Sequence, residues 1–232
     1  MRVVFALFLD WLYFGDLSRF VQVKFAPLAM LNTLPSLPLT LVGCVAALAV
    51  TATLVLDFGQ RLPVDWRPRG LIHFLALTVL FVDFTILSAR LSSEFPEARI
   101  AGVIQALADT ANNATTQQQV PTDRRGFEEW VRDNAGPVPL FKDGVPLGQW
   151  HVELREDCNG PAATAGLSPP GTLVYCVAPD RRHAWITAVA MPLGQRFGKP
   201  EIISIEGAFV GDVAVPVEPE REEPPVWERP TP

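Results

Sequence analysis

Two long apolar segments dominate the hydrophobic pattern of the chain. Residues 37–56 contain no charged side chain in twenty positions, and residues 71–89 contain one, Asp83, in nineteen. A helix rises about 1.5 Å per residue, so about 20 residues cross a hydrocarbon layer of about 30 Å. The pattern predicts two membrane-spanning helices, at residues 36–57 and 71–91. The alternative is a pair of buried core helices in a large soluble protein.

The segment between the two apolar stretches, residues 58–70, predicts their orientation. It contains Arg61, Arg67 and Arg69, the densest basic group beside either span. Loops rich in Arg and Lys stay in the cytoplasm. We therefore expect a bacterial inner-membrane protein with a short cytoplasmic loop and both chain termini in the periplasm.

Residues 1–35 mix short apolar runs with charged side chains. A third span here would carry four charges into lipid, which is costly: Asp10, Asp16, Arg19 and Lys24. The many aromatic residues of this segment suit the headgroup layer or a protein partner. The sequence therefore predicts an amphipathic N-terminal arm that lies at the membrane interface or against a partner.

Residues 92–215 have the pattern of a small α+β domain with an antiparallel sheet. Apolar positions 100, 103, 104 and 107 recur at helical spacing after Pro96, and a second, short helix is predicted over residues 125–133. Asp143-Gly144 is a hairpin signal, and it predicts that residues 138–141 pair with residues 150–155. The predicted strands are residues 138–141, 150–155, 172–178, 183–191 and 201–210.

Residues 216–232 contain six Pro and five Glu. Such a composition cannot bury a core, so this tail is expected to be extended.

The cysteines provide an independent indication of compartment. Cys158 and Cys176 both lie in the polar half of the chain, and a disulfide between them would persist only in an oxidising compartment. The alternative is two free thiols. Cys44 lies inside the first apolar segment, where it acts as a small apolar residue.

Composition and motifs exclude several classes of function. The formal net charge is −6 and the mean hydropathy is +0.21, so a basic nucleic-acid-binding protein is excluded. The sequence holds no phosphate loop, dinucleotide fingerprint, nucleophile elbow or zinc-type Cys/His spacing. We expect no enzyme activity, no cofactor, no metal and no small-molecule substrate.

A few residues inside the apolar segments are candidates for specific contacts. Gly43, Ala47 and Thr51 form a small-residue face suited to close helix packing, either within the hairpin or against another protein. Asp83 is the one carboxylate within the two apolar segments, residues 37–56 and 71–89, and we expect it to bond to Thr51, Thr53 or another subunit. The alternative is that it belongs to a proton relay or an ion site. His73 is a weak candidate for a haem or chlorophyll ligand.

These observations predict a non-catalytic structural or accessory subunit of a larger inner-membrane complex, respiratory or photosynthetic, whose partners are other membrane subunits and the lipid bilayer. A second reading rests on the span that continues into an amphipathic helix and a disulfide-bearing sheet, from Gly70 to about Met191. In outline this is similar to type IV pilins and pseudopilins, although Leu75 stands where that family has Glu. A third reading is a periplasmic sensor or enzyme that uses His151, Glu153 and His183.

Overall fold

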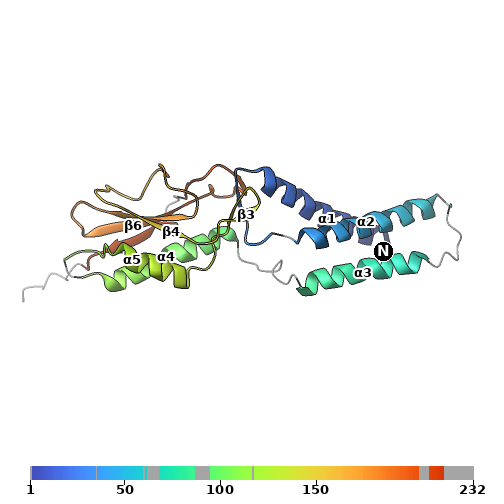
Figure 1. Ribbon diagram of the computed structural model, residues 1–232, viewed down its shortest axis with the longest axis horizontal. Coiled ribbons are helices and arrows are strands. Elements are labelled where there is room, and N and C mark those ends of the chain that lie inside the picture. Colours follow the sequence, from blue (N-terminus) through green and yellow to red (C-terminus); the bar gives the residue numbers. More distant parts are fainter. Residues whose placement is uncertain are drawn as a thin grey trace, which may run out of the picture.

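The chain folds into a helical bundle at one end and an α+β head at the other (Figure 1). This computed structural model describes residues 2–34, 36–59, 61, 68–86, 95–116, 118–203 and 209–216. The bundle contains α1 (Arg2–Phe25), α2 (Leu37–Phe58) and α3 (Pro68–Ile86). By length and composition, α2 and α3 are each able to cross a membrane, as the sequence predicts.

The N-terminal segment differs from the predicted arm. Its first 24 helical residues, α1, pack antiparallel along α2 and contribute to the same apolar core. Arg2 lies 3.7 Å from Asp57 at the end of α2, and Arg69 at the start of α3 lies 2.9 Å from the same carboxylate. The N-terminal end of α1 therefore lies where α2 meets α3, and the head lies at the opposite end.

The helical periodicity of α1 explains why it packs in this way. Ala6, Leu9, Tyr13 and Asp16 recur every three or four residues and are buried against the neighbouring helices. Their spacing is that of one helix face. The charges that argued against an embedded helix are thus distributed by face, which a count along the chain does not reveal.

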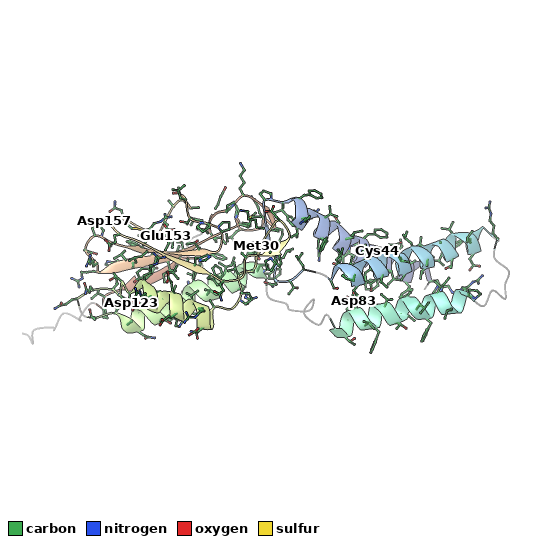
Figure 2. All side chains as sticks on the ribbon, viewed as in Figure 1. Met30, Cys44, Asp83, Asp123, Glu153 and Asp157 are labelled. Atoms are coloured by element: carbon green, nitrogen blue, oxygen red, sulfur yellow. A yellow bond between two sulfur atoms is a disulfide. The ribbon has the colours of Figure 1, made fainter. Side chains whose placement is uncertain are left out.

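A short strand connects the bundle to the head. After α1, β1 (Leu28–Met30) pairs with β2 (Leu140–Lys142) and β7 (Phe197–Gly198) in a four-stranded antiparallel sheet, and β3 (Val145–Pro146) completes it. Met30 marks this junction in Figure 2. A part of the predicted arm is therefore a strand of the head, paired with residues more than a hundred positions away.

The predicted hairpin turn is present, but it joins a different pair of strands. Asp143 and Gly144 have φ angles of 53° and 81°, and they connect β2 to β3. Positive φ at both central residues is what a tight two-residue hairpin requires. The predicted partner strand, residues 150–155, instead belongs to the second sheet, so this pairing was wrong.

The second sheet has five strands and is mixed rather than purely antiparallel. Its order is β4 (His151–Arg155), β5 (Thr172–Val177), β6 (His183–Ala190) and β8 (Glu201–Ile203), and β9 (Gly211–Ala214) also pairs with β6. β4 and β5 run parallel because residues 156–171 return the chain to the same end of the sheet. The other described pairings in this sheet are antiparallel, as predicted.

Two helices cover one face of this sheet. The first, α4 (Pro96–Ala114), packs on β6 and β9, and the second, α5 (Arg124–Asn134), packs on β4. Both correspond to predicted helices. Asp123 caps α5 by accepting a hydrogen bond from the Arg125 amide at 3.1 Å. The predicted extended tail lies outside the described residues, apart from Pro216.

The contact between β9 and α4 generates a prediction for the head. A Cβ atom at Gly211 would lie 2.8 Å from the Ala108 Cβ and 3.1 Å from the Ile104 carbonyl oxygen. We expect Gly211→Ala to push β9 off the helix and lower the free energy of unfolding by roughly 1–3 kcal/mol. The measurement is thermal unfolding of the full chain in detergent, followed by near-ultraviolet circular dichroism.

The matched control is Gly102→Ala on α4, where a Cβ meets nothing within 4 Å. Alanine favours a helix over glycine by about 1 kcal/mol, so this variant should be at least as stable as the parent. Equal stability of the two variants would contradict the close β9–α4 contact.

Candidate functional site

The bundle interior brings together polar side chains from all three helices. Asp83 of α3 is fully buried, Asp16 of α1 is 5 % exposed, and Thr40 and Thr53 of α2 are also buried. From the sequence, Asp83 is the one carboxylate within the two apolar segments, residues 37–56 and 71–89. The structure adds Asp10 and Asp16 of α1 to the same bundle, a feature that the linear sequence argument missed.

Asp10 has a partner on the facing helix. The Thr51 hydroxyl donates to Asp10 Oδ2 at 3.0 Å, so the third position of the predicted small-residue face serves as a hydrogen-bond donor. Thr53 donates to the Val50 carbonyl within its own helix at 2.7 Å. Figure 2 shows Asp83 on α3 near the end of the bundle that faces the head.

The small-residue face of α2 receives α1. A Cβ atom at Gly43 would overlap the Tyr13 ring, so the ring occupies the space that a side chain would fill. Ala47, one turn further on, is fully buried. Small residues allow this kind of close helix approach in membranes. The partner of the face is thus a helix of the same chain.

His73 lies at the other end of the bundle. Its Nδ1 is 2.8 Å from the Arg69 carbonyl oxygen, a distance at which a protonated nitrogen donates within α3. Among the described residues, no group of three or more His, Cys, Asp or Glu side chains is placed to hold a metal ion.

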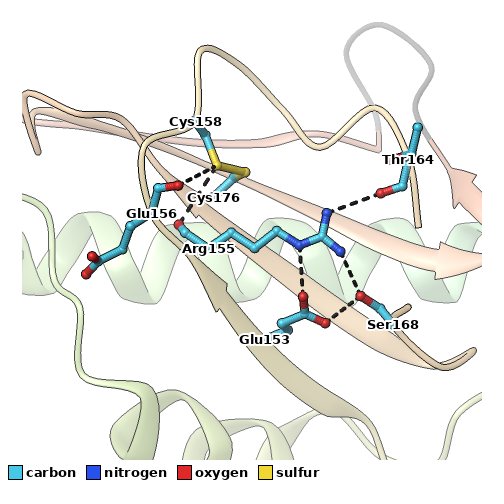
Figure 3. The surroundings of a disulfide bond; sticks show 7 residues. All are labelled: Glu153, Arg155, Glu156, Cys158, Thr164, Ser168 and Cys176. Carbon is cyan, nitrogen blue, oxygen red and sulfur yellow. Dashed lines mark hydrogen bonds and ion pairs between the residues drawn. A yellow bond between two sulfur atoms is a disulfide. The ribbon is translucent and has the colours of Figure 1, made fainter. Parts of the chain in front are cut away.

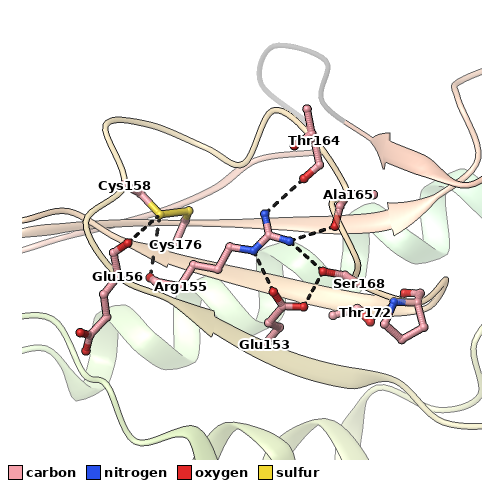
Figure 4. A network of polar contacts seen from close by, with 10 residues as sticks. Glu153, Arg155, Glu156, Cys158, Thr164, Ala165, Ser168, Thr172 and Cys176 are labelled. Carbon is pink, nitrogen blue, oxygen red and sulfur yellow. Dashed lines mark hydrogen bonds and ion pairs between the residues drawn. A yellow bond between two sulfur atoms is a disulfide. The ribbon is translucent and has the colours of Figure 1, made fainter.

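A second polar cluster lies on the head, along the edge of β4. Figure 3 shows the Arg155 guanidinium between Glu153, Thr164 and Ser168, beside the Cys158–Cys176 disulfide. Arg155 Nε donates to Glu153 at 2.9 Å, and its Nη atoms donate to the Thr164 and Ala165 carbonyls at 3.2 and 3.0 Å. The Ser168 hydroxyl accepts from Arg155 and donates to Glu153 (Figure 4). The cluster holds the connection between β4 and β5 against the sheet.

The predicted disulfide is formed and fixes the same connection at its start. Cys158 and Cys176 have Cα atoms 5.7 Å apart and are separated by 18 positions. A cross-link that closes a loop of this length removes chain entropy from the unfolded state, worth about 3 kcal/mol. The disulfide and the Arg155 cluster together explain how an irregular connection allows the parallel pairing of β4 and β5.

Electrostatics in this cluster favour a charged Glu153. Partial burial opposes its ionisation, but hydrogen bonds from Ser168 and Arg155, with the Arg155 charge, outweigh burial and lower the pKa of Glu153 below its ordinary 4.5. Elsewhere in the head, burial raises the pKa of the Tyr175 phenol. Neither group is thereby tuned toward proton transfer near neutral pH.

The residues suggested for a catalytic centre are not brought together. His151 pairs with Thr172 at one end of β5, whereas the His183 carbonyl accepts from the Ala178 amide beyond the other end. Six positions along a strand correspond to about 20 Å. The two imidazoles therefore lie at opposite ends of the sheet, and Glu153 is engaged with Arg155 between them.

A hollow of about 310 Å³ lies between α4 and α5. Its lining includes three small residues of α4, Ala98, Gly102 and Ala106, and two residues of α5, Trp130 and Asn134. It contains none of the residues that the sequence singled out.

Comparisons with protein-family models, with characterised proteins and with solved structures find no match to this chain. The geometry and its chemistry therefore carry the functional argument.

The contact between Tyr13 and Gly43 generates a prediction for the bundle. We expect Gly43→Val to displace the ring and weaken the α1–α2 contact by roughly 1–3 kcal/mol, since overpacking forces a shift of backbone or side chain. Unfolding in mixed micelles of increasing dodecyl sulfate, followed by circular dichroism at 222 nm, measures this loss.

Gly15→Ala is the matched control for that variant, because a Cβ at Gly15 meets nothing within 4 Å. It should unfold at the parent's detergent ratio or above it. If Gly43→Val also unfolds at the parent's detergent ratio or above it, the close packing of Tyr13 on α2 is wrong.

The Glu153 cluster generates a prediction in pH. A carboxyl whose pKa is lowered by folding stabilises the protein above its unfolded pKa, and this stabilisation disappears as pH falls through the folded pKa. Glu153→Gln should therefore lower the melting temperature at neutral pH, and the difference from the parent should shrink below pH 4.5. The loss should be under ~1 kcal/mol, because the side chain is 38 % exposed.

Glu156→Gln, which removes a neighbouring exposed carboxylate 3.9 Å from Arg181, is the control. A pH-independent difference between Glu153→Gln and the parent would show that the charge of Glu153 is not what holds the cluster.

Proposed function

We propose that the protein is a membrane-anchored, non-catalytic structural subunit of a larger bacterial inner-membrane assembly, with its head in the periplasm. The observation that carries the proposal is the inverted polarity of the bundle. Its outer surface is largely apolar, and four polar side chains are buried inside it: Asp16, Thr40, Thr53 and Asp83. The exposed Thr78 and Thr85 hydroxyls donate to carbonyl groups of their own helix. That arrangement suits hydrocarbon as the surrounding medium.

The outer surfaces of α2 and α3 expose large apolar side chains, as contact with hydrocarbon requires. Exposed side chains of α2 include Val45 at 68 %, Leu48 at 56 % and Val55 at 65 %, and those of α3 include Phe74 at 66 % and Phe81 at 69 %. Apolar patches of this extent are rare on soluble monomers. The two helices therefore support anchoring more strongly than their length alone does.

The head supports the periplasmic assignment and the non-catalytic role. Its disulfide requires an oxidising compartment, and the basic residues Arg61 and Arg69 flank the opposite end of the bundle. The charged groups of the Arg155 cluster bond to one another and to a loop, which favours a structural function. A bundle of this size does not enclose a transport path, which favours action with other subunits.

The resemblance to pilins gains no support from this arrangement. The fully buried Ala76 of α3 packs in one core with α1 and α2, so this span is part of a three-helix bundle, whereas the outline shared with pilins contains this span alone.

The experiment is purification of the tagged full chain from native membranes in a mild detergent, with mass by light scattering and subunits by mass spectrometry. We expect a particle whose protein mass is well above the 25.5 kDa of the chain, with other membrane proteins in constant ratio. An unrelated tagged inner-membrane protein, prepared identically, controls for adventitious binding. A monodisperse monomer would contradict the proposal.

A further inference from the structure

The N-terminal helix α1 lies alongside α2 over most of its length. Three contacts place it there: Arg2 with Asp57 at 3.7 Å, Asp10 with Thr51 at 3.0 Å, and the Tyr13 ring over Gly43. From the N-terminal end of α1 toward its C-terminal end, the partner residues on α2 are Asp57, Thr51 and Gly43, so the two helices run antiparallel. With 24 residues, α1 is about 36 Å long, comparable with the 22 residues of α2. If α2 crosses a membrane, α1 is carried through the same layer.

The outer face of α1 is apolar over the length that this layer requires. Val4 is 69 % exposed, Leu7 63 % and Trp11 73 %, and Phe8 and Phe14 are exposed beside them. These side chains continue the apolar surface of α2 and α3 around the bundle. In water, these aromatic and aliphatic side chains would form a large exposed apolar patch.

The four charges that argued against a span in this segment, Asp10, Asp16, Arg19 and Lys24, do not oppose this placement. Asp10 is bonded to Thr51 inside the bundle, and Asp16, itself buried, lies 3.9 Å from Arg19. Arg19 is exposed, and it lies 17 positions from Arg2, a distance of about 26 Å along the helix. Two long arginines at this spacing reach the two surfaces of a hydrocarbon layer of about 30 Å. Lys24 lies beyond it and donates to the Asp143 carbonyl of the head at 3.2 Å.

We propose that α1 is a third membrane-crossing helix, whose outer face contacts lipid acyl chains and whose N-terminal end lies on the same side of the membrane as Arg61. The head then lies on the opposite side. This inference rests on the proposed membrane anchoring, and it changes the number of crossings from two to three.

The test is labelling of single cysteines by a membrane-impermeant maleimide in spheroplasts. Cys44→Ala removes the free thiol of the described chain, since Cys158 and Cys176 are bonded. Three full-length variants in that background carry a cysteine inserted before Arg2, Arg61→Cys, or Thr33→Cys. Thr33 is exposed between α1 and α2 at the head end.

A three-crossing protein gives one labelling pattern. Thr33→Cys reacts in intact spheroplasts, and the other two react at least tenfold faster after lysis. If the inserted cysteine reacts from outside together with Thr33→Cys while Arg61→Cys stays protected, α1 does not cross and the inference is overturned. If alkaline carbonate releases the parent chain from membranes, the anchoring itself is wrong, which is a separate failure.

A second measurement identifies what covers the outer face. Trp11 lies about 14 Å along α1 from its start, near mid-depth. In vesicles of phosphatidylcholine brominated deep in the acyl chain, the parent should lose more fluorescence than Trp11→Phe. Trp130→Phe, in the head, should be quenched like the parent. Equal quenching of parent and Trp11→Phe would show that protein, either a second copy or another subunit, covers this face.

Discussion

The packing of α1 on α2 depends on where α1 places its two carboxylates. An ionised carboxylate facing lipid costs about 2.5–3.5 kcal/mol even on lenient scales. Asp10 avoids this cost through Thr51, and Asp16 is buried beside Arg19. Gly43 supplies the close approach, because its missing side chain leaves room for the Tyr13 ring between the two acids. Hydrogen bonding and shape thus act at the same interface.

The same helix connects the bundle to the head. The chain leaves α1, adds β1 to a sheet of the head, and returns immediately to form α2. Backbone bonds from Met30 to Arg196 and from Leu31 to Pro139, at 2.9 and 3.0 Å, fix this crossing. A head attached through a strand in its own sheet cannot turn freely on the bundle. In the proposed structural role, this coupling would keep the orientation of the head fixed relative to the bundle.

The sequence contained the parts of the fold that depend on local pattern. Hydropathy located α2 and α3, helical periodicity located α4 and α5, and the placement of Cys158 and Cys176 indicated their disulfide. The sequence did not predict β1, because a strand of three residues has no recognisable hydrophobic pattern and its pairing partners lie far along the chain. Nor does alternation reveal that β4 runs parallel to β5. The charges of α1 misled because they were counted along the chain; a helical wheel over residues 2–17 places Asp10 and Asp16 on the half opposite Trp11.

The most direct test of this account is a pair of spin-label distances in lipid bilayers. Val4, Val21 and Phe58 are all exposed, and labels at Val4→Cys and Phe58→Cys would lie at the same end of the bundle. Antiparallel packing predicts that the 4–58 pair is closer than the 21–58 pair by about 20 Å or more, since 17 helical positions separate the two sites on α1. Two similar distances, both near the hydrocarbon thickness of about 30 Å or above it, would show that α1 lies on the membrane surface and would contradict the account.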